Sequence, residues 1–302
     1  MHKHAAIFLF LSALISIGKL HAFNGCGTFE VEAELIYFRP SVNSVLIQQA
    51  PDVNAVVGTN KVLDLHYTPG WRIGLNWESV NQCGGINFRW TQLRATNQTT
   101  YAGSDDLNLD FISATIREPL TERKRFSYHA FEALYNYSIS LSNYFNIDIL
   151  AGLQYAWLTK SERYTGATTL AKQNSRTWGI GPEIGFDAYW GVCGSLALVG
   201  RGTCALLTSR HHGGYILNVT GALVNPVGAG NTDALWSVVP TFDLRFGVNY
   251  ARTFNCLNIY IEAGYEALTY HQAIIGAQGD VFVQDAVDAT MQGPYFAAGI
   301  SF

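Results

Sequence analysis

The side chains that could do catalytic or metal chemistry are few and scattered in this sequence. His211 and His212, together with His271, could ligate a metal ion, and Asp105 or Asp106 beside one of them could activate water for hydrolysis. Spacing supports neither idea, because a metal site needs three or four converging ligands and no such cluster surrounds the histidine pair. The sequence therefore predicts no metal, no cofactor and no catalytic site.

Residues Gly179 to Gly185 form a glycine-rich segment that is superficially similar to a nucleotide-binding loop. The glycine spacing departs from the nucleotide-binding pattern by one residue, and no helix pattern follows it. Pro182 also removes a backbone donor. Small side chains on a crowded face of a sheet explain these glycines better.

Charged side chains recur at every second position in many segments, opposite an equally regular apolar set. Within residues 29–37, for example, Glu30, Glu32 and Glu34 alternate with mostly apolar residues. Because successive strand residues point to opposite faces, this pattern predicts β-strands with one charged and one apolar face. The charged face comprises Glu30, Glu32, Glu34, Arg72, Glu78, Arg89, Asp148, Glu183, Asp187, Arg201, Asp243, Arg245, Glu262 and Glu266.

The C-terminal segment indicates what kind of sheet these strands build. Phe302, Ile300, Ala298 and Phe296 alternate with small or polar residues up to the last position. A terminal edge strand with an apolar face invites aggregation in water, whereas a strand of a closed barrel has both edges paired and meets lipid. An aromatic ending is also typical of bacterial outer-membrane barrels, so Phe302 is predicted to be the insertion signal for the barrel-insertion machinery.

Two strand segments carry aromatic residues 12 positions apart on the apolar face, Phe145 with Trp157 and Trp178 with Trp190. At about 3.3 Å per residue and a tilt of about 45°, 12 residues climb roughly 28 Å, which is close to the apolar band of a membrane barrel. Ten segments carry the alternation, although the phase of the fourth is not fixed. They lie near residues 29–37, 71–78, 86–91, 125–139, 145–157, 177–190, 195–208, 238–250, 257–266 and 293–302.

The connections between these segments alternate in length. Four short ones lie near residues 79–84, 141–143, 191–194 and 252–255, and five long ones near residues 40–64, 95–124, 160–174, 209–235 and 271–288. This is the topology of a bacterial barrel. The sequence therefore predicts an all-β fold, an antiparallel transmembrane β-barrel of ten strands with short periplasmic turns and long outer loops. Eight or twelve strands are the alternatives.

The N-terminus resembles a secretory signal peptide over residues 1–22. It has a basic lead at Lys3, an uncharged run from Ala5 to Ile17 and a plausible cleavage site after Ala22. Cleavage removes Lys3 and Lys19, so 17 of the 19 basic residues remain against 23 acidic ones. The resulting net charge near −6 argues against a nucleic-acid partner. Residues 23–302 are then the barrel, and its predicted location is the bacterial outer membrane.

The charged face must avoid lipid. A charge aimed at the middle of a bilayer costs about 2–4 kcal/mol, and ten such costs would exceed the stability of a typical protein. The charged residues are therefore predicted to line the barrel interior. Two interpretations remain open: a channel lining whose acidic surplus favours cations, or a salt-bridged plug that fills a narrow barrel.

Four of the five cysteines fall near the predicted periplasmic rim, where oxidising conditions let disulfides persist. Cys26 and Cys83 lie at the ends of adjacent strands, which predicts a bridge between them. Cys193 and Cys256 could bridge to each other or to neighbouring envelope proteins. Cys204 lies too far along its strand to join either pair.

Five pieces spread over the mature chain carry a family resemblance. They are Phe29–Pro40, Pro69–Leu75, Trp178–Gly185, the Gly264-Tyr265-Glu266 triplet and the terminal Phe302. In order and spacing these pieces resemble the Legionella-type major outer membrane protein family, pore-forming barrels also found in chlamydia-like bacteria. The resemblance implies a porin-like role and brings no catalytic motif.

We therefore expect an outer-membrane channel for passive diffusion of small solutes or ions, with the preference for cations that an acidic lining favours. Its other expected partner is outer-membrane lipid. A structural or adhesive barrel with a closed lumen is the alternative, and a barrel enzyme is a distant one.

Overall fold

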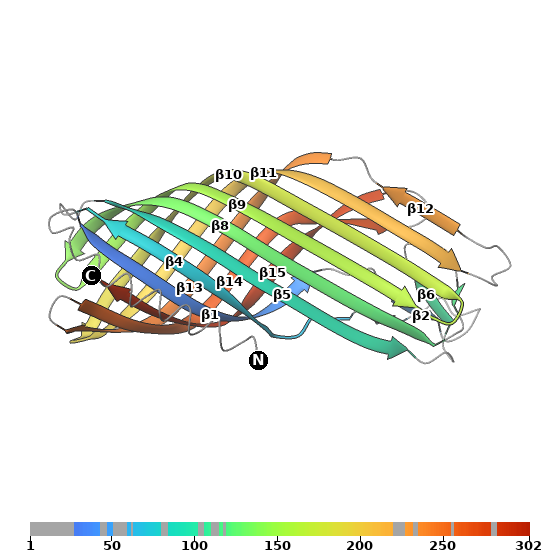
Figure 1. The fold of residues 1–302 in the computed structure, drawn as a ribbon, viewed down its shortest axis with the longest axis horizontal. Helices are drawn as coiled ribbons and strands as arrows, with labels where there is room; N and C mark the ends of the chain where they lie inside the picture. The colour runs from blue at the N-terminus through green and yellow to red at the C-terminus, as the bar shows by residue number, and fades with distance from the viewer. Residues whose placement is uncertain are drawn as a thin grey trace.

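The computed structural model describes residues 27–42, 47–50, 59–61, 63–79, 84–101, 106–109, 115–116, 119–219, 227–231, 235–254, 257–278 and 283–302. Ten long strands wind around one axis and close into a barrel (Figure 1). They are β1 (Thr28–Val42), β4 (Thr68–Glu78), β5 (Gly85–Tyr101), β8 (Leu120–Ser142), β9 (Phe145–Thr165), β10 (Thr169–Cys193), β11 (Leu196–Val219), β13 (Leu235–Phe254), β14 (Leu257–Gln278) and β15 (Val283–Ser301).

Every pairing in the barrel is antiparallel, and each strand pairs with its neighbours in chain order. The circle closes where β1 meets β15, with Glu30 opposite Ser301 and Leu35 opposite Phe296. Backbone hydrogen bonds of 2.9 Å between Phe29 and Phe302 extend this pairing to the last residue. The predicted antiparallel barrel of ten strands is confirmed, and both edges of the C-terminal strand are paired.

The two ends of the barrel differ. At one end, tight turns join β8 to β9 after Ser142 and β10 to β11 after Cys193. The opposite end carries a small sheet of β2 (Ile47–Ala50), β3 (Thr59–Lys61), β6 (Asp106–Leu109) and β7 (Thr115–Ile116), and β12 (Val227–Asn231) pairs with β11 there. In Figure 1 the C-terminus lies at the tight-turn end, away from β6 and β12. We call these the periplasmic end and the outer end.

An aromatic girdle marks where the barrel leaves the membrane on the outer side. Successive ring contacts run around it, with centroid separations of 4.5 Å, 5.5 Å, 6.3 Å, 6.5 Å and 5.8 Å. The rings in order are Trp71, Trp90, Phe131, Tyr155, Trp178 and Trp236. Below the girdle the outward face exposes apolar side chains such as Leu153, Ile184 and Phe246, as a lipid-facing band does.

Beyond the girdle the strands continue instead of ending. The predicted long loop at residues 160–174 is wrong, because β9 runs to Thr165 and β10 starts at Thr169. A hydrogen bond of 2.8 Å from Gly166 N to Thr169 O closes the hairpin between them. Outward side chains are polar here, as at Arg176 and Lys172 on β10, so the apolar alternation stops while the backbone ladder goes on. The barrel wall therefore continues past the aromatic girdle.

Candidate functional site

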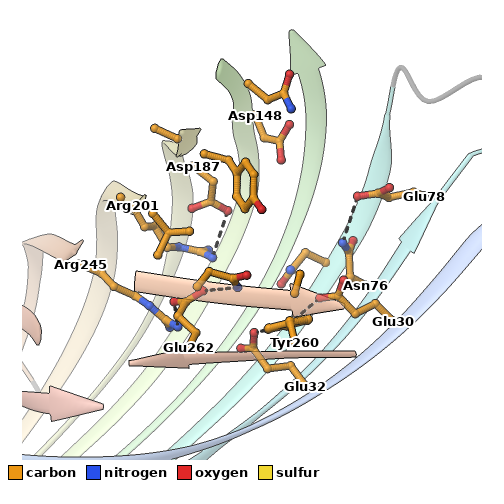
Figure 2. A pocket seen from close by; sticks show the side chains of 18 of the residues that line it. Glu30, Glu32, Asn76, Glu78, Asp148, Asp187, Arg201, Arg245, Tyr260 and Glu262 are labelled. Atoms are coloured by element: carbon orange, nitrogen blue, oxygen red, sulfur yellow. Dashed lines mark hydrogen bonds and ion pairs between the residues drawn. The ribbon is translucent and has the colours of Figure 1, made fainter. Parts of the chain in front are cut away.

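The candidate site is the barrel interior, which has distinct layers along its axis. At the periplasmic end lies a cavity of about 540 Å³ that we call the acidic vestibule (Figure 2). The Tyr260 hydroxyl lies 3.0 Å from Glu30 Oε1 and 2.5 Å from Glu32 Oε2, and its single hydrogen can be donated to either carboxylate. The charged lining residues are Glu30, Glu32, Glu78, Arg89, Asp148, Asp187, Arg201, Arg245 and Glu262. Six carboxylates thus face three guanidinium groups, which makes the vestibule acidic.

A network of buried ion pairs lies in the lumen above the vestibule. Arg72 bonds through Nη1 to Glu34 Oε1 at 2.8 Å and through Nη2 to Glu266 Oε1 at 2.6 Å. Arg245 bonds to Glu34 Oε2 at 2.7 Å and to Glu262 Oε1 at 2.6 Å. These contacts join β1, β4, β13 and β14 through side chains. The arginine Arg72 is only 2% exposed, so water contributes little to its solvation.

A second ion-pair group lies on the other side of the interior. Glu132 on β8 stands 3.6 Å from both Arg89 on β5 and Arg201 on β11. Arg201 also approaches Asp187 at 3.4 Å, which ties this group to the vestibule. Glu132 was not singled out from the sequence because its strand was the one whose phase stayed open. The structure places Glu132 on the inward face of β8, because the even-numbered residues there are buried: Phe126, Tyr128, Ala130, Glu132 and Leu134.

An apolar layer fills the lumen on the outer side of the ion pairs. Tyr128 on β8 and Tyr270 on β14 share a hydrogen bond of 2.9 Å between their hydroxyls, and both are almost fully buried. These strands are five steps apart in either direction around the barrel, so the bond crosses its full width. Large buried residues around the pair are Ile36, Phe38, Leu93, Phe126, Leu158, Leu207, Leu268 and Met291. The sequence pattern gave no sign of this layer.

A third charged group lies beyond the girdle, inside the projecting wall. Glu162 Oε1 forms ion pairs with Lys160 Nζ at 3.1 Å and with Lys124 Nζ at 3.7 Å. Lys124 Nζ also donates a hydrogen bond of 3.0 Å to the Val42 carbonyl. Burial lowers the pKa of Lys124. Burial also raises the pKa of the nearby carboxyl of Glu122, which accepts a 2.7 Å hydrogen bond from the Tyr101 hydroxyl. The interior is therefore occupied by side chains in the outer projection as well.

The structure places all fourteen predicted interior residues on the inward face. Eight are buried in the middle of the lumen: Glu34, Arg72, Arg89, Glu183, Arg201, Asp243, Arg245 and Glu266. The other six line the vestibule: Glu30, Glu32, Glu78, Asp148, Asp187 and Glu262. Their role as a pore lining remains a prediction, because the same positions hold the ion pairs that fill the lumen.

The histidines do not gather into one site. His211 points inward and lies 3.0 Å from Thr177 Oγ1 and 2.6 Å from Ser237 Oγ, whereas its neighbour His212 is on the opposite face of β11. His271 lies 2.8 Å from Asp288. Asp105 and the side chain of Asp106 fall outside the described residues. Within the described part of the chain, no three histidine, cysteine or acidic side chains converge as a metal site would need.

The disulfide predictions stay untested. Cys26, Cys83 and Cys256 lie outside the described residues, and so do residues 1–22. Cys193 is exposed at the end of β10, and Cys204 faces outward in the middle of β11. The second of these positions agrees with the expectation that Cys204 is distant from the rim.

Three solved barrels are similar to this chain at low identity. The outer membrane protease OmpT from Escherichia coli has 9% identity over 91% of this chain and 96% of its own, with a TM-score of 0.42. The translocator domain of autotransporter NalP from Neisseria meningitidis has 9% identity over 99% and 96%, with a TM-score of 0.41. A Pseudomonas aeruginosa FadL homologue has 8% identity over 93% of each chain and a TM-score of 0.30.

No curated protein matches the sequence. In the described residues, no helix is long and apolar enough to cross a membrane. One protein family does match, and it is described as the Legionella pneumophila major outer membrane protein precursor. The match runs from residue 24 to residue 302, which is nearly the whole chain. The protein therefore belongs to the Legionella major outer membrane protein family and is a β-barrel of the bacterial outer membrane.

Proposed function

We propose that this protein is a structural barrel of the outer membrane whose lumen is sealed by its own side chains. The observation that carries the proposal is the hydrogen bond between Tyr128 and Tyr270, which joins strands on opposite sides of the barrel. Ten strands enclose little room, so side chains that meet across the axis leave no wide path. This favours the plug interpretation of the interior charges over the open channel lining.

The layers on either side support the same conclusion. An ion that passed Arg72 would have to displace the carboxylates of Glu34 and Glu266, which form ion pairs with the Arg72 guanidinium at 2.6–2.8 Å. It would then meet the apolar layer, where a narrow hydrophobic constriction excludes water and ions. A solute thus faces two successive barriers of different chemistry.

The family match supports a role in the outer membrane. We propose that the rim cysteines, Cys26, Cys83, Cys193 and Cys256, add covalent links within the barrel or to other envelope proteins. We also propose that the insertion machinery reads the terminal strand that ends at Phe302.

A second candidate is the diffusion channel with a preference for cations. The acidic vestibule favours it, because six carboxylates at the periplasmic mouth would concentrate cations. Buried polar atoms of Arg89, Arg201, Glu183 and Asp243 also lack a hydrogen-bond partner within the described residues. Water could satisfy these atoms, so this side of the lumen is where a narrow path would form.

Vesicle swelling distinguishes the two candidates. The full-length protein is refolded into phospholipid vesicles, which are then diluted into an isotonic solution of a five-carbon sugar. A sealed barrel predicts the same swelling rate as vesicles that received heat-denatured protein. A rate that rises with the amount of folded protein, and rises further for smaller solutes, would establish the channel and contradict the sealed barrel.

A further inference from the structure

Seven basic side chains lie on the outward face beyond the aromatic girdle, from Arg210 beside Trp178 out to Arg163, eight residues past Tyr155. They lie on five consecutive strands, β5, β8, β9, β10 and β11. The group, which we call the basic belt, consists of Arg94, Arg123, Arg125, Arg163, Lys172, Arg176 and Arg210. We propose that the basic belt binds a phosphorylated glycolipid of the outer leaflet. This binding site is independent of whether the lumen is sealed.

The strand register brings three of these cations into direct apposition. Arg123 on β8 is the cross-strand partner of Arg163 on β9, which in turn is the partner of Lys172 on β10. Like charges directly opposite each other destabilise a sheet, since cross-strand side chains start about 4.5–5.5 Å apart. A row of three therefore needs anions to be stable.

Within the residues that the structure describes, no acidic side chain supplies those anions. None of the seven side chains forms an ion pair with any residue that the structure describes, and Nε of Arg210 is buried without a hydrogen-bond partner. Acidic residues on the same five strands point into the lumen, as Glu122, Glu132 and Glu162 do. The described part of the chain therefore offers the belt no counter-ion, and an anion from outside would fill this role.

The opposite side of the barrel shows that this arrangement is local. There, Arg39 on β1 pairs with Asp64 at 2.8 Å, and His271 on β14 pairs with Asp288 on β15 at 2.8 Å. At the outer end of that side, Arg39 and His271 each have an acidic partner, whereas the side chains of the basic belt have none among the described residues. The chain as a whole is also acidic, with a formal charge of −4, so a general excess of positive charge does not explain the belt.

The inner edge of the belt lies at the level of lipid headgroups. Arg176 stacks over Trp157 with 4.2 Å from its guanidinium carbon to the ring centroid, and Arg210 stands 5.9 Å from the Trp236 ring. Girdle aromatics lie at the level of lipid headgroups, so these two guanidinium groups do as well. A molecule that places phosphates there and acyl chains on the apolar band below would contact both surfaces. A glycolipid with phosphates on its sugars has this combination.

Lipid titration of the detergent-solubilised full-length protein tests the proposal. The probe is a glucosamine-disaccharide lipid with two phosphates, and the comparison is the same lipid without phosphates, with bound lipid counted by native mass spectrometry. The test variant is Arg163→Gln with Lys172→Gln. The matched control is Arg39→Gln with Arg252→Gln, which removes the same charge from a paired site and from the periplasmic end. Arg94→Gln with Arg176→Gln is an independent second pair if the first variant does not fold.

We expect the wild-type protein to bind the phosphorylated lipid at least about tenfold more tightly than the unphosphorylated one, because each basic side chain near a charged lipid surface contributes about fivefold. The belt variant should lose this preference and the control should keep it. Equal affinity for the two lipids, or an equal loss in belt and control variants, would overturn the proposal. Competition by inorganic diphosphate at matched phosphate concentration would also overturn it, since the belt would then be a plain anion site.

Discussion

Replacing Arg72 with methionine is the substitution that best probes the interior ion-pair layer. The guanidinium of Arg72 is 2% exposed and provides the ion pair that Glu266 makes at 2.6 Å. Methionine keeps most of the side-chain volume but removes the charge, so a buried carboxylate at Glu266 loses its partner. Breaking a buried pair in this way costs about 3–5 kcal/mol, a large share of the roughly 5–15 kcal/mol that stabilises a typical protein. We therefore expect the free energy of unfolding to fall by that amount.

The measurement is denaturant unfolding in phospholipid vesicles, followed by tryptophan fluorescence. Arg39→Met is the matched control, because its pair with Asp64 has a similar separation of 2.8 Å but side chains that are 46% and 61% exposed. An exposed pair contributes at most about 1 kcal/mol. Adding Glu266→Gln to Arg72→Met should recover part of the loss, since the unpaired charge is then gone. If Arg72→Met costs no more than Arg39→Met, the interior is filled with water and the reasoning fails.

Two further substitutions test the strand phase and the packing of the wall. Ile149→Arg should lower the free energy of unfolding in vesicles by about 2–4 kcal/mol, because the side chain faces lipid. Asp148→Asn should cost much less, because Asp148 faces the vestibule. Equal effects would contradict the assignment of inward and outward residues on β9. Gly264→Ala should cost about 1–3 kcal/mol in the same assay, because a Cβ there would collide with the backbone of the neighbouring strand. Gly74→Ala, whose Cβ would lie 3.4 Å from its nearest neighbour atom, should be tolerated, and a Gly264→Ala protein as stable as Gly74→Ala would argue against the packing described here.

The lipid-facing side of the barrel could be predicted from the sequence because one physical rule governs it. A side chain that meets hydrocarbon must be apolar, so Phe145, Ile149 and Trp157 mark the outward face of β9 without reference to any contact. The pairing of strands then follows from their order in the chain. The ten strands and their antiparallel arrangement could be read from the sequence for this reason.

The interior obeys no such rule, and here the sequence was less informative. On β8 the inward set includes Phe126 and Tyr128 as well as Glu132, so both faces look apolar and the phase could not be fixed. Tyr128 and Tyr270 are 142 positions apart in the chain, and their contact depends on the curvature of the closed barrel. Nothing local to either residue could have revealed it.

The extent of the strands was also underestimated, for a related reason. Past the girdle, the outward residues Arg176 and Lys172 meet water and lipid headgroups, so hydrophobic alternation disappears at that point. Backbone hydrogen bonding between strands does not require hydrophobic alternation, and β10 keeps its pairing with β9 out to Leu170 and Thr165. When a barrel projects beyond its membrane, a strand end predicted from the loss of hydrophobic alternation therefore falls too early, and the strand is predicted too short.

Single-channel recording tests the sealed lumen most directly. The refolded full-length protein is added to a planar lipid bilayer with different KCl concentrations on the two sides. The account predicts no stepwise conductance above the bare bilayer, even though protein recovered from the membrane migrates as a folded barrel. Reproducible ohmic steps with a cation-selective reversal potential would contradict it, and would show that the layer at Tyr128 and Tyr270 opens.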